Sequence, residues 1–177
     1  MKMENIGKFK IKSGKIIITD PCYEKGIWCQ ERAENVKKGT WSAYIKKTND
    51  QLFGERISEL IAVHDDFDIE EMNFEKHSNN IGVDSGQAGI FDEKYYKDDS
   101  IVKDNMLSHI RSDEKWYSMC CKQSLSEEQA GVVLFGCVSS SGYGDGNYSH
   151  YVCFVNDEIV AVKIIFIGDE EENEGDE

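Results

Sequence analysis

Apolar and polar residues alternate along much of the chain, which is the pattern of strands with one buried face. Phe9 and Ile11 alternate with lysines, and a short apolar, β-branched run at 15–19 follows the turn signal Ser13-Gly14. This spacing predicts a first hairpin across residues 8–20. Asp20-Pro21 ends the hairpin, because proline has no N–H to donate to a sheet.

Further strands are predicted at 40–48, after a turn at Gly39, and at 56–67, 81–83, 132–138, 148–155 and 158–167. Within the first of these, Trp41, Ala43 and Ile45 share one face of the strand. The segment 132–138, VVLFGCV, is nearly all apolar and is predicted to be one central strand. The last two strands are predicted to form a hairpin across Asn156-Asp157, a strong turn signal.

Helical character is confined to a few short segments. The strongest candidate is 91–110, where Asp92 is a possible helix cap. A second candidate is 113–124, and a third, shorter one is 68–74. About eight strands against two or three short helices predict an α+β domain. We expect mainly antiparallel β structure, as a sandwich or a partly open barrel-like sheet.

Length and composition predict one globular domain at 1–168 in a chain of 177 residues, followed by a mobile tail at 169–177. Seven of those nine tail residues are acidic. The chain lacks a run of about 18 apolar residues, and its start lacks the apolar core of a signal peptide. These features predict a cytoplasmic protein that does not contact membranes. A cytoplasmic location argues against disulfides among the six cysteines, and the absence of a Cys-x-x-Cys pair argues against a zinc ribbon.

Charge is distributed unevenly along the chain, whose net charge is −14. Residues 1–64 contain 12 Lys and Arg and 8 Asp and Glu, whereas residues 65–177 contain 8 and 26. This balance argues against direct binding to nucleic acid and favours a basic protein partner. The densest acidic segment contains Asp65, Asp66, Asp68, Glu70 and Glu71. Such carboxylates could imitate a phosphate backbone, although a solvated acidic edge is the commoner role of such a segment.

Two glycine-rich segments, IGVDSGQAGIFD at 81–92 and SSSGYGDGNYSHY at 139–151, each adjoin an apolar run. Glycine at this density marks sharp turns or close approach of the backbone to another group. The polar residues in and near these segments either hold turns together or face a ligand. They are Asp20, Asp84, Ser85, Asp92, Asp145 and Tyr148.

Three chemistries can be written for these residues, and none has a specific spacing. A nucleophilic Cys22 would need His64 or His150 as its base. Asp84, Asp92 and Asp145 are hard oxygen ligands for Ca²⁺ or Mg²⁺, but EF-hand spacing is absent. GYGDG lacks the Lys-Ser/Thr of a phosphate-binding loop. We therefore expect no catalytic residue, no metal and no cofactor.

Several motifs occur in one order: SGKIIITDPCY, GTW, IAVHDDF, GVDSGQAGIFD and SGYGDGNY. Over residues 8–168 the chain resembles a bacterial domain-of-unknown-function family. That family is marked by an early Asp-Pro, a central V-D-S-G-x-A-G-x-x-D and a late G-Y-G-D-G-x-Y. The resemblance implies family membership but no activity.

The leading hypothesis is a non-catalytic binding protein that acts on a basic macromolecule through its acidic surface. Usage rich in Lys, Glu, Asn, Asp and Ile is typical of AT-rich bacteria and their mobile elements. Small acidic proteins of this composition include phage-borne inhibitors of CRISPR effectors. The most concrete form of the hypothesis is therefore an inhibitor of a nucleic-acid-handling effector, of the anti-CRISPR type. The alternative is a polar ligand-binding or metal-binding pocket, or a hydrolase, built from the two glycine-rich segments.

Overall fold

The structure is a computed structural model that describes residues 2–77, 79–109 and 113–168. Two antiparallel sheets lie face to face, and most of the core fills the space between them. The sheets do not close into a barrel, and the expected mainly antiparallel α+β class is confirmed. The predicted tail at 169–177 lies outside the described residues. Among the residues that the structure describes, no helix is long and apolar enough to cross a membrane.

The larger sheet has seven strands. In spatial order they are β1 (Met3–Ile11), β4 (Gly39–Asp50), β5 (Gly54–His64), β12 (Glu158–Ile165), β11 (Gly146–Val155) and β6 (Glu75–Lys76), with β7 (Ile81–Val83) also paired to β11. The smaller sheet has five. In order they are β3 (Glu31–Ala33), β2 (Ile16–Thr19), β8 (Gln87–Asp92), β10 (Gly136–Ser140) and β9 (Ala130–Val133).

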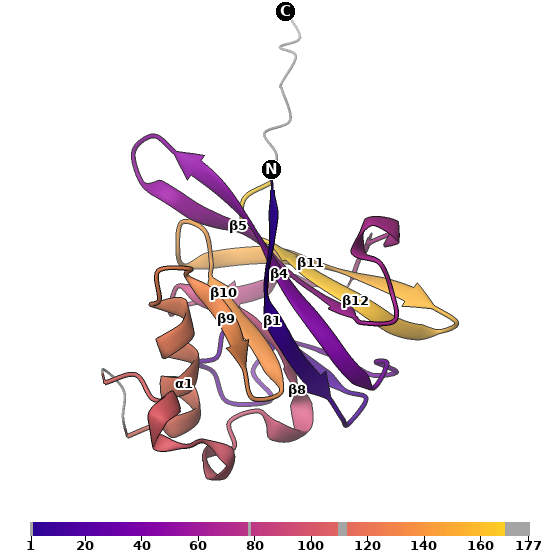
Figure 1. The fold of residues 1–177 in the computed structure, drawn as a ribbon, viewed down its shortest axis with the longest axis horizontal. Helices are drawn as coiled ribbons and strands as arrows, with labels where there is room; N and C mark the ends of the chain where they lie inside the picture. Colours follow the sequence, from indigo (N-terminus) through magenta and orange to yellow (C-terminus); the bar gives the residue numbers. More distant parts are fainter. Residues whose placement is uncertain (1, 78, 110–112, 169–177) are drawn as a thin grey trace, which may run out of the picture.

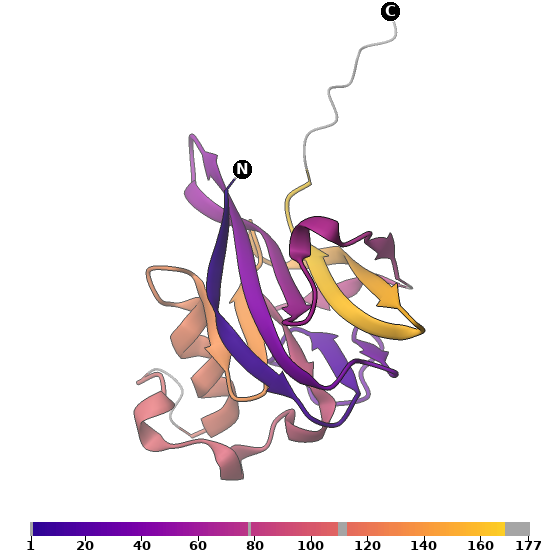
Figure 2. The same ribbon diagram turned by 45° about the vertical axis from the view of Figure 1, so that its right-hand side comes forward.

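Each sheet is covered on its outer face, so the molecule has four layers (Figures 1 and 2). Helix α1 (Lys115–Ser124) packs on the smaller sheet through Trp116, Met119 and Cys120, which join Ile17 and Phe91 in a second core. The segment 65–76 lies over the larger sheet, where its apolar side chains join a third cluster of buried residues.

The predicted hairpin across residues 8–20 is wrong. β1 pairs with β4 in the larger sheet, while β2 pairs with β3 and β8 in the smaller one. The Ser13-Gly14 turn is real, and Gly14 has a φ of +75°. At this turn the chain passes from the larger sheet to the smaller one. Both faces of β2 are buried, which suits a strand in the interior of the smaller sheet.

The prediction of one strand over residues 132–138 is also wrong. β9 and β10 form a hairpin there, with Val133 opposite Gly136. Its turn contains Phe135 at a φ of +61°, which bulky side chains rarely adopt. The ring of Phe135 stacks on Tyr95, with centroids 3.9 Å apart. This tertiary contact offsets the local cost, and no turn residue in the sequence indicates it.

The prediction of a helix over 91–110 is wrong in the same region. Phe91 and Asp92 end β8, and three single 3₁₀ turns follow within the described residues. They are η2 (Glu93–Tyr95), η3 (Asp99–Ile101) and η4 (Asp104–Met106). The short helix predicted at 68–74 is one 3₁₀ turn, η1 (Ile69–Glu71). The helix predicted at 113–124 is confirmed as α1.

Candidate functional site

The two glycine-rich segments lie side by side. β7 in the first segment pairs with β11 in the second, which sets Val83 opposite Gly146. The backbone N–H of Ser141 donates to the carbonyl oxygen of Gly86 at 3.0 Å. The hydroxyl of Tyr148 lies 3.0 Å from the carbonyl oxygen of Ser141 and closes the second loop on itself. Tyr148 therefore holds a turn.

Asp20 anchors the first segment to the end of β2. Its side chain is fully buried. Each of its two carboxylate oxygens accepts two hydrogen bonds. Oδ1 accepts from the Cys22 N–H at 2.9 Å and the Ser85 hydroxyl at 2.6 Å. Oδ2 accepts from the N–H groups of Asp84 and Ser85 at 2.8 and 2.7 Å. With four donors in place, Asp20 and Ser85 have a structural role.

Asp92 plays the same part at the turn between β1 and β2. It is fully buried, and its Oδ2 accepts from the N–H groups of Lys12 and Ser13 at 2.7 and 3.1 Å. Its Oδ1 accepts from the Lys94 N–H at 3.1 Å. Asp84 and Asp145 are exposed instead. The buried Asp92 thus serves the backbone, whereas the other two members of the suggested Ca²⁺ or Mg²⁺ set face solvent.

A different trio with metal-ligand chemistry converges among the described residues: Glu31, His77 and His150. Burial, and then electrostatic interaction with His77 and Lys76, lower the pKa of His150 to about 4. The sequence gives little signal for this trio, because the three residues are far apart along the chain and follow no motif.

Cys22, the suggested nucleophile, is half-buried beside Asp20 and Ser85. Burial, and then the negative charge of Asp20, raise the pKa of the Cys22 thiol to about 12. A thiol with this pKa stays protonated near neutral pH and is a poor nucleophile. The environment of Cys22 therefore opposes the hydrolase hypothesis.

His64, one of the two suggested bases, is committed to the backbone through both ring nitrogens. Its Nδ1 lies 3.1 Å from the Asp66 N–H, which must be the donor. Its Nε2 lies 2.9 Å from the carbonyl oxygen of Lys38 and must therefore carry the proton. Neither nitrogen of this buried ring is left to take up a proton from a nucleophile.

Gln87 links the first glycine-rich segment to α1, which sequence reasoning did not predict. The Ser124 hydroxyl donates to Gln87 Oε1 at 2.9 Å, and Gln87 Nε2 donates to the Tyr117 hydroxyl oxygen at 3.4 Å. Burial raises the pKa of Tyr117 to about 12. These contacts are buried or half-buried, so they fix α1 on the sheet.

The acidic segment at 65–71 presents its carboxylates in two ways. Asp65 is tied down, because its carboxylate accepts from Lys8 Nζ and the Ser42 hydroxyl, both at 2.6 Å. Burial alone would raise the pKa of Asp65, but these two hydrogen bonds outweigh it and lower the pKa below its usual value. Asp68 caps η1 by accepting from the Glu70 N–H at 2.9 Å.

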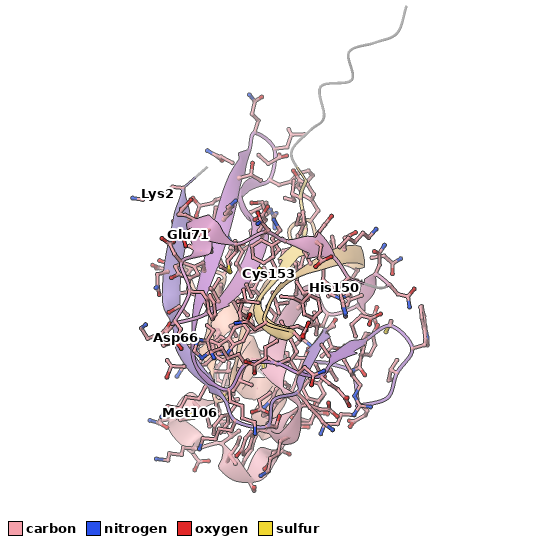
Figure 3. All side chains as sticks on the ribbon, turned by 90° about the vertical axis from the view of Figure 1, so that its right-hand side faces the viewer. Lys2, Asp66, Glu71, Met106, His150 and Cys153 are labelled. Carbon is pink, nitrogen blue, oxygen red and sulfur yellow. The ribbon has the colours of Figure 1, made fainter. Side chains whose placement is uncertain are left out.

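The other three acidic residues of the segment, Asp66, Glu70 and Glu71, are also exposed. Asp66 and Glu71 are labelled in Figure 3. Asp66 has a side chain 72% exposed, and its nearest ionisable partner is His64 at 3.8 Å. None of the salt bridges among the described residues includes Glu70 or Glu71. Within the described part of the chain, these three acids therefore form no salt bridge to Lys or Arg.

The fold and the site together define a mainly β protein with two sheets, in which the buried Asp20 and Asp92 accept hydrogen bonds from the backbone of turns. The family model described as "Protein of unknown function (DUF4241)" matches residues 9–164. Since this match covers most of the chain, the protein belongs to the DUF4241 family, and the resemblance seen in the sequence is confirmed at this level. Comparison with curated proteins and with solved structures gives no match.

Proposed function

We propose that the chain is a cytoplasmic, non-catalytic binding protein that engages a basic macromolecular partner through Asp66, Glu70 and Glu71. The observation that carries this proposal is that these exposed carboxylates, which make no salt bridge to a described Lys or Arg, stand on a segment that is fixed to the larger sheet. Phe67, Ile69, Met72 and Phe74 pack on that sheet.

Because the backbone of this segment is held on the sheet, only the side chains that carry the carboxylates need to be ordered when a partner binds, which lowers the cost of association. The net charge of −14 adds long-range attraction toward a basic surface and speeds encounter. A groove that normally holds a phosphate backbone has the complementary charge. The most specific form of the proposal is thus an inhibitor of a basic nucleic-acid-handling effector, such as a CRISPR nuclease.

The proposal is tested by reversing the three charges together, in Asp66→Lys/Glu70→Lys/Glu71→Lys. We expect the triple variant to fold, because all three side chains are exposed, and to lose the partner in quantitative pull-downs from the bacterial host. Wild-type capture should fall steeply between about 50 and 200 mM salt. A purified CRISPR nuclease tests the specific form, through inhibition of DNA cleavage.

The matched control reverses the same number of charges in the C-terminal sequence, in Glu170→Lys/Glu171→Lys/Glu172→Lys. Equal loss of capture in the control and the test variant would mean that net charge alone acts. Unchanged capture by the test variant would refute the proposal.

The competing function is a ligand pocket at the two glycine-rich segments. The double variant Asp84→Ala/Asp145→Ala distinguishes it from binding through the acidic segment. Both side chains are exposed, so the fold should tolerate the change. Our proposal requires that this variant keeps wild-type partner binding.

A further inference from the structure

Glu31, His77 and His150 form a group of potential metal ligands outside the acidic segment and the aspartate-braced turns. One carboxylate oxygen and one ring nitrogen from each histidine all lie within 4.8 Å of one another. Three segments far apart in the sequence supply them, so the arrangement depends on the fold.

The two histidines are neighbours across a pair of strands. β6 pairs with β11 at Lys76 and Tyr151, and the next residue pair along the ladder is His77 and His150. The N–H of His77 donates to the carbonyl oxygen of His150 at 3.1 Å. Val152, two residues beyond His150 and on the same face, lies in the core between the sheets. His150, labelled in Figure 3, therefore points toward the smaller sheet.

Glu31 approaches from that smaller sheet. It begins β3, where it pairs with Ile18, and Ala33 lies two residues further along the same strand. Ala33 belongs to the core between the sheets, so Glu31 shares its face and points toward the larger sheet. The trio thus bridges the two layers.

The histidine geometry suits coordination of a metal ion. Nδ1 of His77 and Nε2 of His150 are 3.2 Å apart and form a hydrogen bond, which an ion between them would replace. The rings meet at 73°, with centroids 5.4 Å apart, so they are not stacked. A tetrahedral ion with metal–nitrogen distances of about 2.0–2.1 Å holds two ligand nitrogens roughly 3.3–3.4 Å apart. The two nitrogens already have nearly this spacing, and the three ligand atoms together, which lie within 4.8 Å of one another, would draw closer around an ion.

Burial makes this pair unusual for the interior of the fold. His150 is fully buried, and it is the Nε2 atom of its ring that faces His77. Its other ring nitrogen, Nδ1, has no hydrogen-bond partner among the described residues, a cost that an ion at Nε2 would not relieve and that an apolar residue would avoid. Glu31 and His77 are half-buried, so an ion can enter from solvent.

We propose that Glu31, His77 and His150 bind one first-row divalent transition-metal ion, for which Zn²⁺ is the test ion. Imidazole nitrogen with one carboxylate suits this class, whereas Ca²⁺ and Mg²⁺ prefer oxygen ligands. Three protein ligands leave one tetrahedral position for water or a small ligand. The bound ion joins the edge of the smaller sheet to β11, independently of the acidic surface.

The test uses the full chain, stripped with EDTA and titrated with Zn²⁺ against a chromophoric chelator. We expect about one equivalent bound, and Co²⁺ should give the visible bands of a tetrahedral site without a thiolate charge-transfer band. His77→Ala and Glu31→Gln should each weaken Zn²⁺ binding at least about tenfold. Zn²⁺ should raise the melting temperature of the wild type and lose this effect in both variants.

His109→Ala is the matched control, because His109 is an exposed histidine outside the trio, and it should bind Zn²⁺ as the wild type does. Circular dichroism establishes that each variant is folded. The proposal is overturned if the wild type binds no stoichiometric Zn²⁺, if both ligand variants bind as tightly as the wild type, or if the Co²⁺ spectrum shows thiolate ligation.

Discussion

At the scale of single residues, the donors around a buried carboxylate decide whether it can do chemistry. The oxygens of Asp20 and Asp92 are occupied by donors from the chain. The sequence could mark them as special but could not separate a brace from a ligand, because both roles use an aspartate beside a glycine turn. Only the partners resolve this, and they lie up to 80 residues away.

The thiol of Cys22 offers a residue-scale test of the non-catalytic proposal. Since its pKa lies near 12 rather than 9.0, the thiolate fraction at pH 8 falls by roughly 10³-fold. We expect correspondingly slow alkylation by iodoacetamide at pH 8, with the rate rising as pH approaches 12. Mass spectrometry can follow this one site, with the unfolded chain as the reference. Alkylation as fast as in the unfolded chain would revive the nucleophile hypothesis.

At the scale of elements, the sequence predicted strands well where apolar and polar residues alternate or where a known turn motif marks the end of a strand. The hairpin of β11 and β12 is an example, because Asn156 and Asp157 adopt φ values of +50° and +65°. Prediction failed where a distant contact decides the local conformation. The turn at Phe135 depends on Tyr95, and the Asp92 cap signal is real but starts a single 3₁₀ turn after a strand.

The same hairpin provides an element-scale prediction. Asp157→Gly should stabilise the protein by about 0.5–1 kcal/mol, because glycine adopts a positive φ without the steric cost borne by other residues. Asp157→Asn is the matched control, since it removes the same charge and keeps a side chain. Urea denaturation measures both. A glycine variant no more stable than the asparagine variant would show that charge, and not backbone strain, limits this turn.

At the scale of the whole molecule, the chain crosses between the two sheets, and Asp20 secures one crossing. Asp84 and Ser85, its donors, lie between β7 of the larger sheet and β8 of the smaller one. The sequence could predict individual strands, but it could not predict that the chain passes back and forth between the two sheets. For the same reason it could not bring Glu31 together with two histidines from the opposite sheet.

Removing this brace should destabilise the whole fold. Asp20→Ala leaves buried donors unpaired and should cost about 3–4 kcal/mol of unfolding free energy. Asp20→Asn keeps one acceptor oxygen and should cost less. Asp84→Ala, at an exposed side chain next to the same loop, is the control and should change stability little. Thermal and urea unfolding provide the comparison, and a tolerated alanine at Asp20 would contradict the structural role.

One strand of the larger sheet takes part in three ladders, and at Tyr151 and Val152 it is paired on both sides. β11 pairs with β12 along one edge and with β6 and β7 along the other. An inserted or deleted residue inside β11 would put three ladders out of register at once and rotate His150 to the opposite face. Insertions in the Asn156-Asp157 turn would disturb only one ladder. Evolutionary change in chain length is thus far cheaper at the tip of this hairpin than within the strand itself.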